Sequence, residues 1–254
     1  LDRPVVETVL PLAQRLAAAG ARLALVGRRR EALEALAGDI PSAALVVADL
    51  GSAPGCRAAV DEARGALGGI DLLVHLAGEG SFRWFTEEDD ETIERLLRTN
   101  CASAMWLAKA LLPEMTARGS GQLVFCGSVL GALALPGYTA YAASKFALRG
   151  FTEGLRRELA GSGVGVTLVA PRAVRTALNP PQVYEMAQAT KMAVDPPEVV
   201  AEAIFEAIRR DAREVVLGGM EPWVVRLNAL WPGLLDRLLR KQTEVVRRFA
   251  RRVP

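Results

Sequence analysis

Tyr141 and Lys145 stand four residues apart in the stretch GYTAYAASKFALRGF, residues 137–151. The residues that follow have the apolar spacing of an amphipathic helix, and side chains four residues apart share one helical face. The Tyr141 hydroxyl and the Lys145 ammonium are therefore expected to reach one point in space. A phenol beside a cation is suited to proton transfer, because the cation favours the phenolate.

The composition favours a globular chain without a strongly charged partner. The 254 residues carry a net charge of +2, with acids and bases interspersed, which argues against nucleic acid as the main partner. Three scattered cysteines favour a reduced, cytoplasmic interior and predict no metal site. The one histidine, His75, lies in an apolar run and is expected to be structural. We expect neither a membrane-spanning helix nor a signal peptide.

Short apolar runs alternate with segments of helical periodicity. The expected strands are 22–27, 43–50, 70–78, 121–128, 165–171 and 213–219, and the expected helices are 9–19, 30–38, 54–67, 88–117, 141–160 and 196–210. Continuous apolar strands are typical of a parallel sheet that is covered on both faces. The pattern predicts an α/β fold with a doubly wound, Rossmann-like parallel sheet, as a single domain with a C-terminal amphipathic helical extension.

Polar residues gather where these strands end. In a doubly wound sheet, ligands bind beyond the carboxyl ends of the strands. The residues at those ends are Gly27, Arg28, Arg29, Asp49, Leu50, Ala77, Gly78, Ser128 and the segment 171–176, while Asn100 lies within the long fourth helical region. These groups are expected to converge on one edge, as a dinucleotide and a small substrate would require.

Six short motifs occur in order at spacings that resemble one family. They are ADL at 48–50, HLAG at 75–78, Asn100, GSVLG at 127–131, YAASK at 141–145 and PRAVRT at 171–176. Over residues 10–220 the chain resembles the short-chain dehydrogenase/reductase family, in which a serine commonly stands thirteen residues before the tyrosine, as Ser128 does here.

The resemblance implies a catalytic group of Asn100, Ser128, Tyr141 and Lys145. Tyr141 would exchange a proton with a carbonyl or alcohol oxygen while hydride moves to or from its carbon. Lys145, together with the positive nicotinamide of the oxidised cofactor, would lower the pKa of the phenol. Ser128 would hydrogen-bond the substrate oxygen, and Asn100 would hold a water that resupplies protons. Each residue also has a structural interpretation. Tyr141 would be a core aromatic residue, Lys145 a solvated side chain, Ser128 a turn residue and Asn100 a helix cap.

The cofactor is predicted to be NADP, with NAD less favoured. An acidic residue at the end of the strand 22–27 would bind a ribose 2′-hydroxyl, but Gly27 stands there and Arg28 and Arg29 follow. Guanidinium groups suit a phosphate, although arginines that open a helix can also be solvated surface. Asp49 and Leu50 would flank the adenine. The resemblance extends the cofactor contacts to Ala77, Gly78, Tyr141, Lys145 and Thr176.

The start of the chain departs from the family. In the family, a glycine-rich turn follows the first strand, and here that turn should fall at residues 2–9, where the sequence is DRPVVETV. The family's first strand also has no counterpart in this sequence, and we expect the missing strand to be at the edge of the sheet. Backbone amides cannot approach a pyrophosphate closely where every residue carries a Cβ. One explanation is that the first residues come from a shifted reading frame. GC-rich codons for Thr-Gly-Pro-Ser-Ser encode Asp-Arg-Pro-Val-Val when the frame begins one base earlier, at a G. Another is a skipped or unordered cofactor loop, and the third is a non-catalytic binding or assembly protein that has lost dinucleotide binding.

Two further positions differ from the family. Arg172 follows Pro171 where glycine is usual, so it would either intrude on the cofactor or reach its phosphates. His75 replaces the first asparagine of the family's N-N-A-G.

The segment 177–198 is expected to form a lid, and its Tyr184, Met186 and Met192 suggest an apolar pocket. The expected substrate is a hydrophobic ketone, aldehyde or secondary alcohol.

The C-terminal region is predicted to be a helical extension of the Rossmann-like domain. We place the Rossmann-like domain at 1–220 and a helical extension at 221–254, in which residues 237–252 hold seven basic side chains and one acid. The segment 223–252 would contact an anionic membrane surface, cap the substrate pocket or pack against another subunit. The resemblance implies a homodimer or homotetramer that pairs through the helices 88–117 and 141–160.

Overall fold

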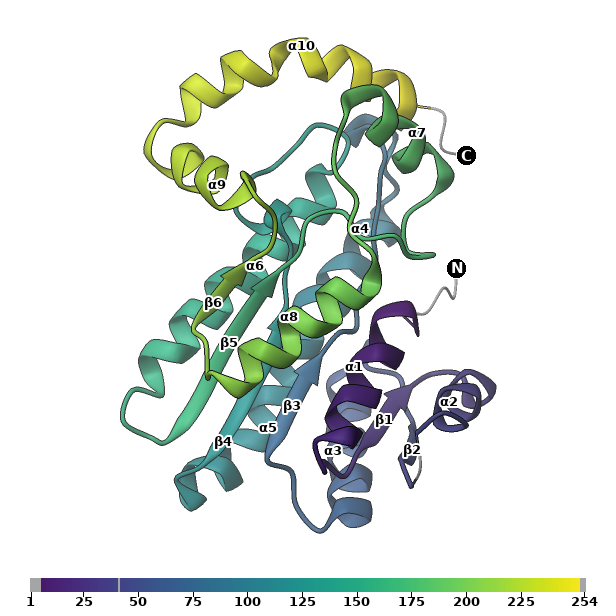
Figure 1. The fold of residues 1–254 in the computed structure, drawn as a ribbon, viewed down its shortest axis with the longest axis vertical. Helices are drawn as coiled ribbons and strands as arrows, with labels where there is room; N and C mark the ends of the chain where they lie inside the picture. Colours follow the sequence, from purple (N-terminus) through teal and green to yellow (C-terminus); the bar gives the residue numbers. More distant parts are fainter. Residues whose placement is uncertain (1–5, 41, 252–254) are drawn as a thin grey trace.

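The computed structural model describes residues 6–40 and 42–251 and has an α/β architecture (Figure 1). Its strands are β1 (Ala24–Gly27), β2 (Ala44–Val47), β3 (Leu72–His75), β4 (Gly121–Cys126), β5 (Val164–Ala170) and β6 (Glu214–Val216). Its helices are α1 (Val6–Ala18), α2 (Arg30–Ala37), α3 (Ala53–Leu67), α4 (Asp90–Leu97), α5 (Ser103–Arg118), α6 (Thr139–Glu158), α7 (Pro181–Thr190), α8 (Pro197–Arg209), α9 (Glu221–Leu230) and α10 (Pro232–Ala250). Every predicted strand forms, and the predicted doubly wound parallel fold is confirmed.

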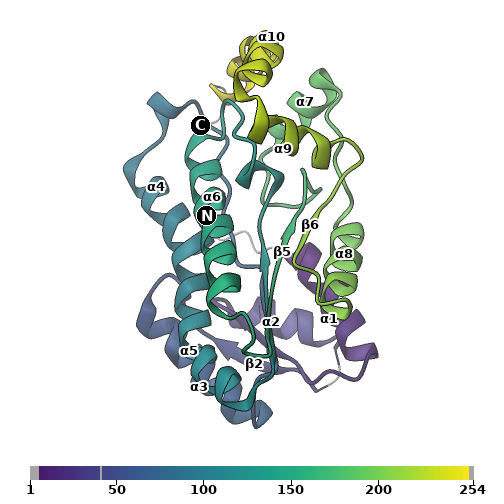
Figure 2. The ribbon, with the colours of Figure 1, turned by 90° about the vertical axis from the view of Figure 1, so that its left-hand side faces the viewer.

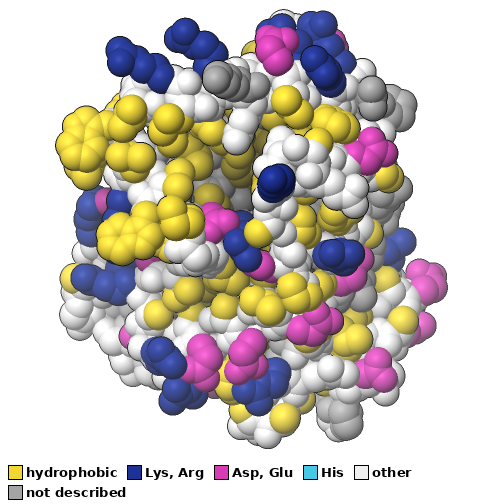
Figure 3. Space-filling model, turned by 45° about the horizontal axis from the view of Figure 1, so that its top comes forward, with side chains coloured by type: hydrophobic (Ala, Val, Ile, Leu, Met, Phe, Trp, Pro, Cys, Tyr) yellow, Lys and Arg dark blue, Asp and Glu magenta, His cyan; other side chains and the backbone are white. Residues whose placement is uncertain are grey.

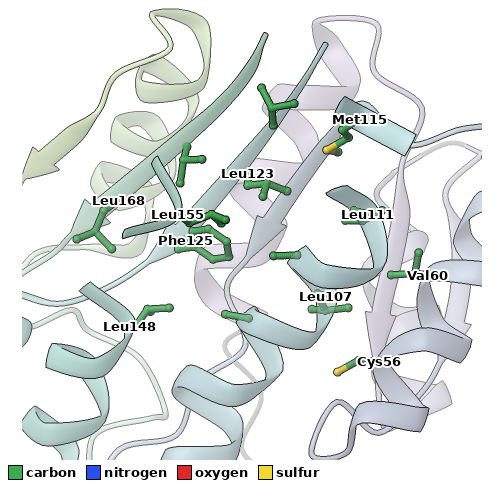
Figure 4. Packing of buried hydrophobic residues seen from close by; sticks show 14 residues of the cluster. Cys56, Val60, Leu107, Leu111, Met115, Leu123, Phe125, Leu148, Leu155 and Leu168 are labelled. Carbon is green, nitrogen blue, oxygen red and sulfur yellow. The ribbon is translucent and has the colours of Figure 1, made fainter. Parts of the chain in front are cut away.

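Helices cover both faces of the parallel strands. Seen edge-on, α3, α5 and α6 lie on one side of the strands, and α1 and α8 lie on the other (Figure 2). The first face buries Leu123 and Phe125 of β4, neither of which is exposed to solvent (Figure 4). Residues between them on the same strand point the other way, so Val124 packs with Ile204 of α8. Burial on both faces explains why these strands are continuous apolar runs.

The strands form two sheets rather than one. β1 pairs with β2 from Ala24–Ala44 to Gly27–Val47, and the second sheet has the order β3-β4-β5-β6. A cavity of about 630 Å³ is lined by β1 on one side and β3 on the other. The gap that corresponds to the family's first strand therefore lies between these two strands in the interior. Our expectation that it would fall at the edge was wrong, because apolar runs do not reveal strand order.

The fourth predicted helix is interrupted at Asn100. α4 ends at Leu97, a π-helical turn spans Arg98–Ala102, and α5 follows from Ser103 to Arg118. A π-turn inserts one residue into the helical ladder and is frequent at functional sites. Here it turns the buried Asn100 side chain toward the ends of β3 and α6.

The C-terminal extension consists of two helices. α9 ends at Leu230, the backbone leaves helical geometry at Trp231, and α10 begins at Pro232, whose fixed φ suits a first helical position. α10 crosses the carboxyl ends of the strands and lies beside α7 (Figure 1). Among the described residues, every helix is too short or too polar to span a bilayer.

Candidate active site

Tyr141 and Lys145 lie in the first turns of α6, beside the end of β4. The Lys145 ammonium is 5.8 Å from the centre of the Tyr141 ring, so the two side chains share one face as predicted. Lys145 is 5% exposed, and its Nζ donates a hydrogen bond to the Cys126 carbonyl oxygen at 3.1 Å. This bond fixes the start of α6 against the carboxyl end of β4. Burial lowers the pKa of Lys145.

Ser128 follows β4 and begins a 3-10 turn (Val129–Gly131). Its Oγ accepts a hydrogen bond from the Leu130 amide at 3.0 Å. Burial raises the pKa of Tyr141, and the hydrogen bond with Ser128 opposes that rise. A positive charge beside the phenol, such as that of an oxidised nicotinamide, would lower this pKa.

Asn100 is fully buried and joins three segments. Its Oδ1 accepts from the Glu79 amide at 2.7 Å, and its Nδ2 donates to the Glu79 carbonyl and to Ser144 Oγ, both at 2.9 Å. The Ser144 hydroxyl in turn donates to the Tyr141 carbonyl oxygen at 2.7 Å. Asn100 thus positions the turn of α6 that carries the tyrosine. Its predicted role in holding a water stays a prediction.

The predicted cofactor residues lie mostly around the cavity between β1 and β3. The described residues that line this cavity include Gly27, Arg28, Arg29, Asp49, Leu50, Ala77 and Gly78. A Cβ at Gly78 would lie 3.4 Å from Asn100 Oδ1 and 3.5 Å from Lys145 Nζ, so glycine leaves a close approach to the catalytic group. Tyr141, Lys145 and Thr176 lie apart from this lining. The Thr176 amide donates to the Tyr184 hydroxyl at 3.0 Å, so Thr176 is held by the segment that we expected to form a lid.

The glycine-free start forms a helix in its described part. Residues 6–9 are the first turn of α1, while residues 2–5 of the predicted turn lie outside the described residues. The Glu7 carboxylate accepts a hydrogen bond from the Ala177 amide at 3.0 Å, and its other oxygen is buried without a hydrogen-bond partner in the described part of the chain. A pyrophosphate at this helix start would meet a carboxylate instead of glycine amides.

Arg172 points toward acidic partners of two other segments. Its guanidinium binds both carboxylate oxygens of Asp195, at 2.9 and 2.6 Å, and Glu221 at 3.0 Å. These contacts raise the pKa of Arg172, with the Asp195 hydrogen bond as the largest cause. Both carboxylates were missed in the sequence, because neither belongs to a motif. The ion pairs join the end of the lid to the start of α9.

Side chains of α7 and α10 form an apolar wall beside Tyr141. One cluster contains Phe82, Tyr138, Val183, Met186, Val246 and Ala250, with Tyr141 and Met192 packed against it. The predicted contributions of Met186 and Met192 are present, whereas the Tyr184 hydroxyl bonds the Thr176 backbone. Sequence reasoning missed Phe82, Tyr138 and Val246. Figure 3 shows hydrophobic side chains gathered around a hollow at this end of the molecule.

Comparison with known proteins identifies the family. The family model described as short chain dehydrogenase matches residues 10–186. Dehydrogenase/reductase SDR family member 7B of Bos taurus is 32% identical over 239 residues, covering 87% of this chain and 74% of that protein. A 2,3-dihydroxy-2,3-dihydro-p-cumate dehydrogenase of Pseudomonas putida is 37% identical over 133 residues, covering 52% of this chain and 51% of that protein. A short-chain dehydrogenase structure from Streptomyces avermitilis superposes with a TM-score of 0.78 at 27% identity, covering 94% of each chain.

The chain therefore belongs to the short-chain dehydrogenase/reductase family and is an oxidoreductase. The family implies a nicotinamide cofactor, NAD or NADP. Two parts of the cavity fit such a group: the polar residues after β1 and β2, and the open approach at Gly78 to Lys145. The start of α1, with Glu7, is the part that does not resemble a phosphate cradle.

Proposed function

We propose that this enzyme moves hydride between NADP and an apolar ketone, aldehyde or secondary alcohol, with Tyr141 as general acid and base. The observation that carries the proposal is the position of the Lys145 ammonium, 5.8 Å from the centre of a Tyr141 ring that packs against an apolar wall. A partly buried phenol beside a cation is suited to exchanging a proton with a substrate oxygen. The apolar wall favours a hydrophobic substrate.

The catalytic side chains have separate tasks. When bound, the nicotinamide supplies or accepts the hydride and brings a positive charge in its oxidised form. In the reductive direction, the Tyr141 hydroxyl donates its proton to the substrate oxygen, and Ser128 hydrogen-bonds the same oxygen. The Lys145 ammonium stabilises the phenolate that remains. Asn100 keeps the first turns of α6 in place through Ser144.

The preference for NADP rests on the end of β1. Arg28 and Arg29 follow Gly27 there and line the cavity that Asp49 and Leu50 also border. A 2′-phosphate would gain charge-assisted hydrogen bonds from two guanidinium groups. No acidic residue stands at this strand end to bind a free 2′-hydroxyl.

We further propose pairing between copies through α4, α5 and α6. Leu97, Met105 and Phe146 are exposed large apolar side chains on these three helices. Exposed apolar side chains on neighbouring helices favour association. Multi-angle light scattering of the chain would show whether it is a dimer or a tetramer.

The first experiment is a fluorescence titration with NADPH and NADH, followed by turnover assays on apolar carbonyl compounds. We expect tighter binding of NADPH and a loss of turnover of about a thousandfold in Tyr141→Phe, the range of general acid–base catalysis. The Tyr141→Phe variant should bind NADPH normally, because it keeps the ring. Absence of binding by both cofactors would overturn the proposal and favour a non-catalytic role.

A further inference from the structure

The C-terminal helices carry a dense group of exposed apolar side chains. Within residues 220–238, six large hydrophobic side chains are between 46% and 70% exposed: Met220, Trp223, Leu230, Trp231, Leu234 and Leu238. We call this group the apolar ridge. It lies at the end of the molecule shown in Figure 3, where hydrophobic and basic side chains adjoin. Single exposed apolar residues are common, but a contiguous group of this kind marks an interaction surface.

The apolar ridge is separate from the side chains that hold these helices on the protein. On α10, Leu235 is 5% exposed and packs with Val225 of α9 and with Leu133, whereas Leu234 and Leu238 face outward. The first half of α10 is therefore apolar on two faces. The inner face already has a partner in the chain, so the outer face requires another explanation.

Basic side chains flank the apolar ridge. Arg226, Arg237 and Arg240 are all exposed, against one exposed acid, Asp236, on the same stretch. The Arg226 guanidinium lies 5.2 Å from the centre of the Trp223 ring. Tryptophan and leucine enter the boundary between lipid headgroups and acyl chains, and arginine remains at the headgroups.

We propose that the apolar ridge docks on the surface of an anionic lipid bilayer. Anionic headgroups would neutralise the flanking arginines while the apolar side chains leave water. A second copy of this chain fits less well, because a two-fold contact through the ridge would bring the arginines of both copies together. The proposal stands on the exposed residues of α9 and α10 and does not depend on the reaction catalysed.

The helices that carry the ridge are fixed to the catalytic unit at both ends. Arg172 binds Glu221 at the start of α9, at 3.0 Å. At the far end of α10, the guanidinium of Arg247 lies 4.6 Å from the centre of the Trp84 ring, and Arg251 pairs with Glu87 at 3.2 Å. Docking through the ridge would therefore place the whole molecule, with the apolar wall near Tyr141, at a defined orientation to the bilayer.

The test is sedimentation of the full chain with lipid vesicles. We would compare vesicles of phosphatidylcholine with vesicles that also contain phosphatidylserine. We expect binding to the anionic vesicles to be about tenfold or more the stronger, and to weaken with added salt. Brominated lipids should quench tryptophan emission in the unaltered protein, which tests ridge contact without any substitution.

Two paired variants separate the apolar from the electrostatic part. Trp223→Ser with Trp231→Ser should lower vesicle binding about tenfold or more, whereas Val199→Ser, at an exposed apolar site on α8, should leave it unchanged. Arg237→Glu with Arg240→Glu should remove the preference for anionic vesicles. Arg22→Glu with Arg57→Glu, at exposed sites outside α9 and α10, should leave that preference in place.

Three results would overturn the proposal. The first is equal sedimentation with and without vesicles. The second is unchanged vesicle binding by the variant with Trp223→Ser and Trp231→Ser. The third is a change in molar mass by light scattering in that variant without a change in vesicle binding, which would assign the ridge to a contact between copies. Circular dichroism of every variant checks that the fold is kept.

Discussion

The two sheets of this enzyme differ in how completely they are built. In the β3–β6 sheet, β4 has a partner on each side and its Leu123 and Phe125 are fully buried. In the β1–β2 sheet, each strand has four residues, and Val26 and Val47 are each 38% exposed. The proposed catalytic group is carried by helices and turns attached to the β3–β6 sheet. Its contacts do not involve the β1–β2 sheet, which would hold the adenosine end of the cofactor.

The largest expected difference is in the cost of removing a strand leucine. Leu123→Ala should lower the free energy of unfolding by about 3–5 kcal/mol, because it empties a closed core. Leu25→Ala on β1 should cost less, about 1–2 kcal/mol. Leu25 already borders the cavity, so neighbouring side chains can move into the space that the substitution leaves. Urea unfolding measures both. Equal costs would show that the two sheets are equally well packed.

Asn100 tests how the catalytic side of the molecule is positioned. Asn100→Ala should lower the free energy of unfolding by about 2 kcal/mol, because the Glu79 amide and carbonyl lose buried hydrogen-bond partners. Turnover should fall by more than cofactor affinity, since the turn that carries Tyr141 loses its support through Ser144. Thermal unfolding and steady-state kinetics measure the two effects. A variant with unchanged turnover would remove Asn100 from the site.

The cofactor side is tested by the arginines after β1. Arg28→Ala with Arg29→Ala should weaken NADPH binding about tenfold, or about 1.4 kcal/mol, and leave NADH binding nearly unchanged. Arg57→Ala, at an exposed arginine of α3 that does not line the cavity, serves as the control. Fluorescence titration with both cofactors gives the ratio. Equal weakening of both would mean that these arginines do not recognise the 2′-phosphate.

His75, at the end of β3, should make stability depend on pH. Its Nε2 lies 2.7 Å from Ser103 Oγ, its Nδ1 is buried without a hydrogen-bond partner among the described residues, and burial lowers its pKa to about 3. Between about pH 6.5 and about 3 the unfolded chain binds this proton and the folded chain does not, so stability falls as the pH falls. The contribution is about 1 kcal/mol per pH unit.

The measurement is the free energy of unfolding by urea across that pH range, in the unaltered protein and in His75→Asn. Asparagine keeps a hydrogen-bonding side chain but does not titrate, so the variant should show a shallower slope. Identical slopes would assign the acid sensitivity to other groups.

The elements and the doubly wound parallel fold were predictable, but the position of the gap in the sheet was not. Apolar segments of six to nine residues predicted all six strands, because burial on both faces requires them. The spacing of Tyr141 and Lys145 predicted their common face. The π-turn at Asn100 left no signal, since the apolar periodicity continues through it. The position of the gap between β1 and β3 depends on strand pairing between distant residues, which local patterns do not encode.

The wall beside Tyr141 shows the same limit at the scale of single residues. Met186 and Met192 were expected because the predicted lid segment follows the last family motif, at 171–176. Phe82 and Val246 come from a loop and from α10, which lie 164 residues apart and have no shared pattern. Their contact arises from packing across the end of the sheet.

The cavity between β1 and β3 also determines how the molecule responds to compression. Hydrostatic pressure favours states of smaller total volume, and unfolding around poorly filled space reduces volume. A cavity of about 630 Å³ lies against β1, whereas Phe125 of β4 is enclosed by side chains on all sides. Pressure should therefore loosen the β1–β2 layer before the β3–β6 layer, so that the molecule yields first where a cofactor would enter and last beside Tyr141.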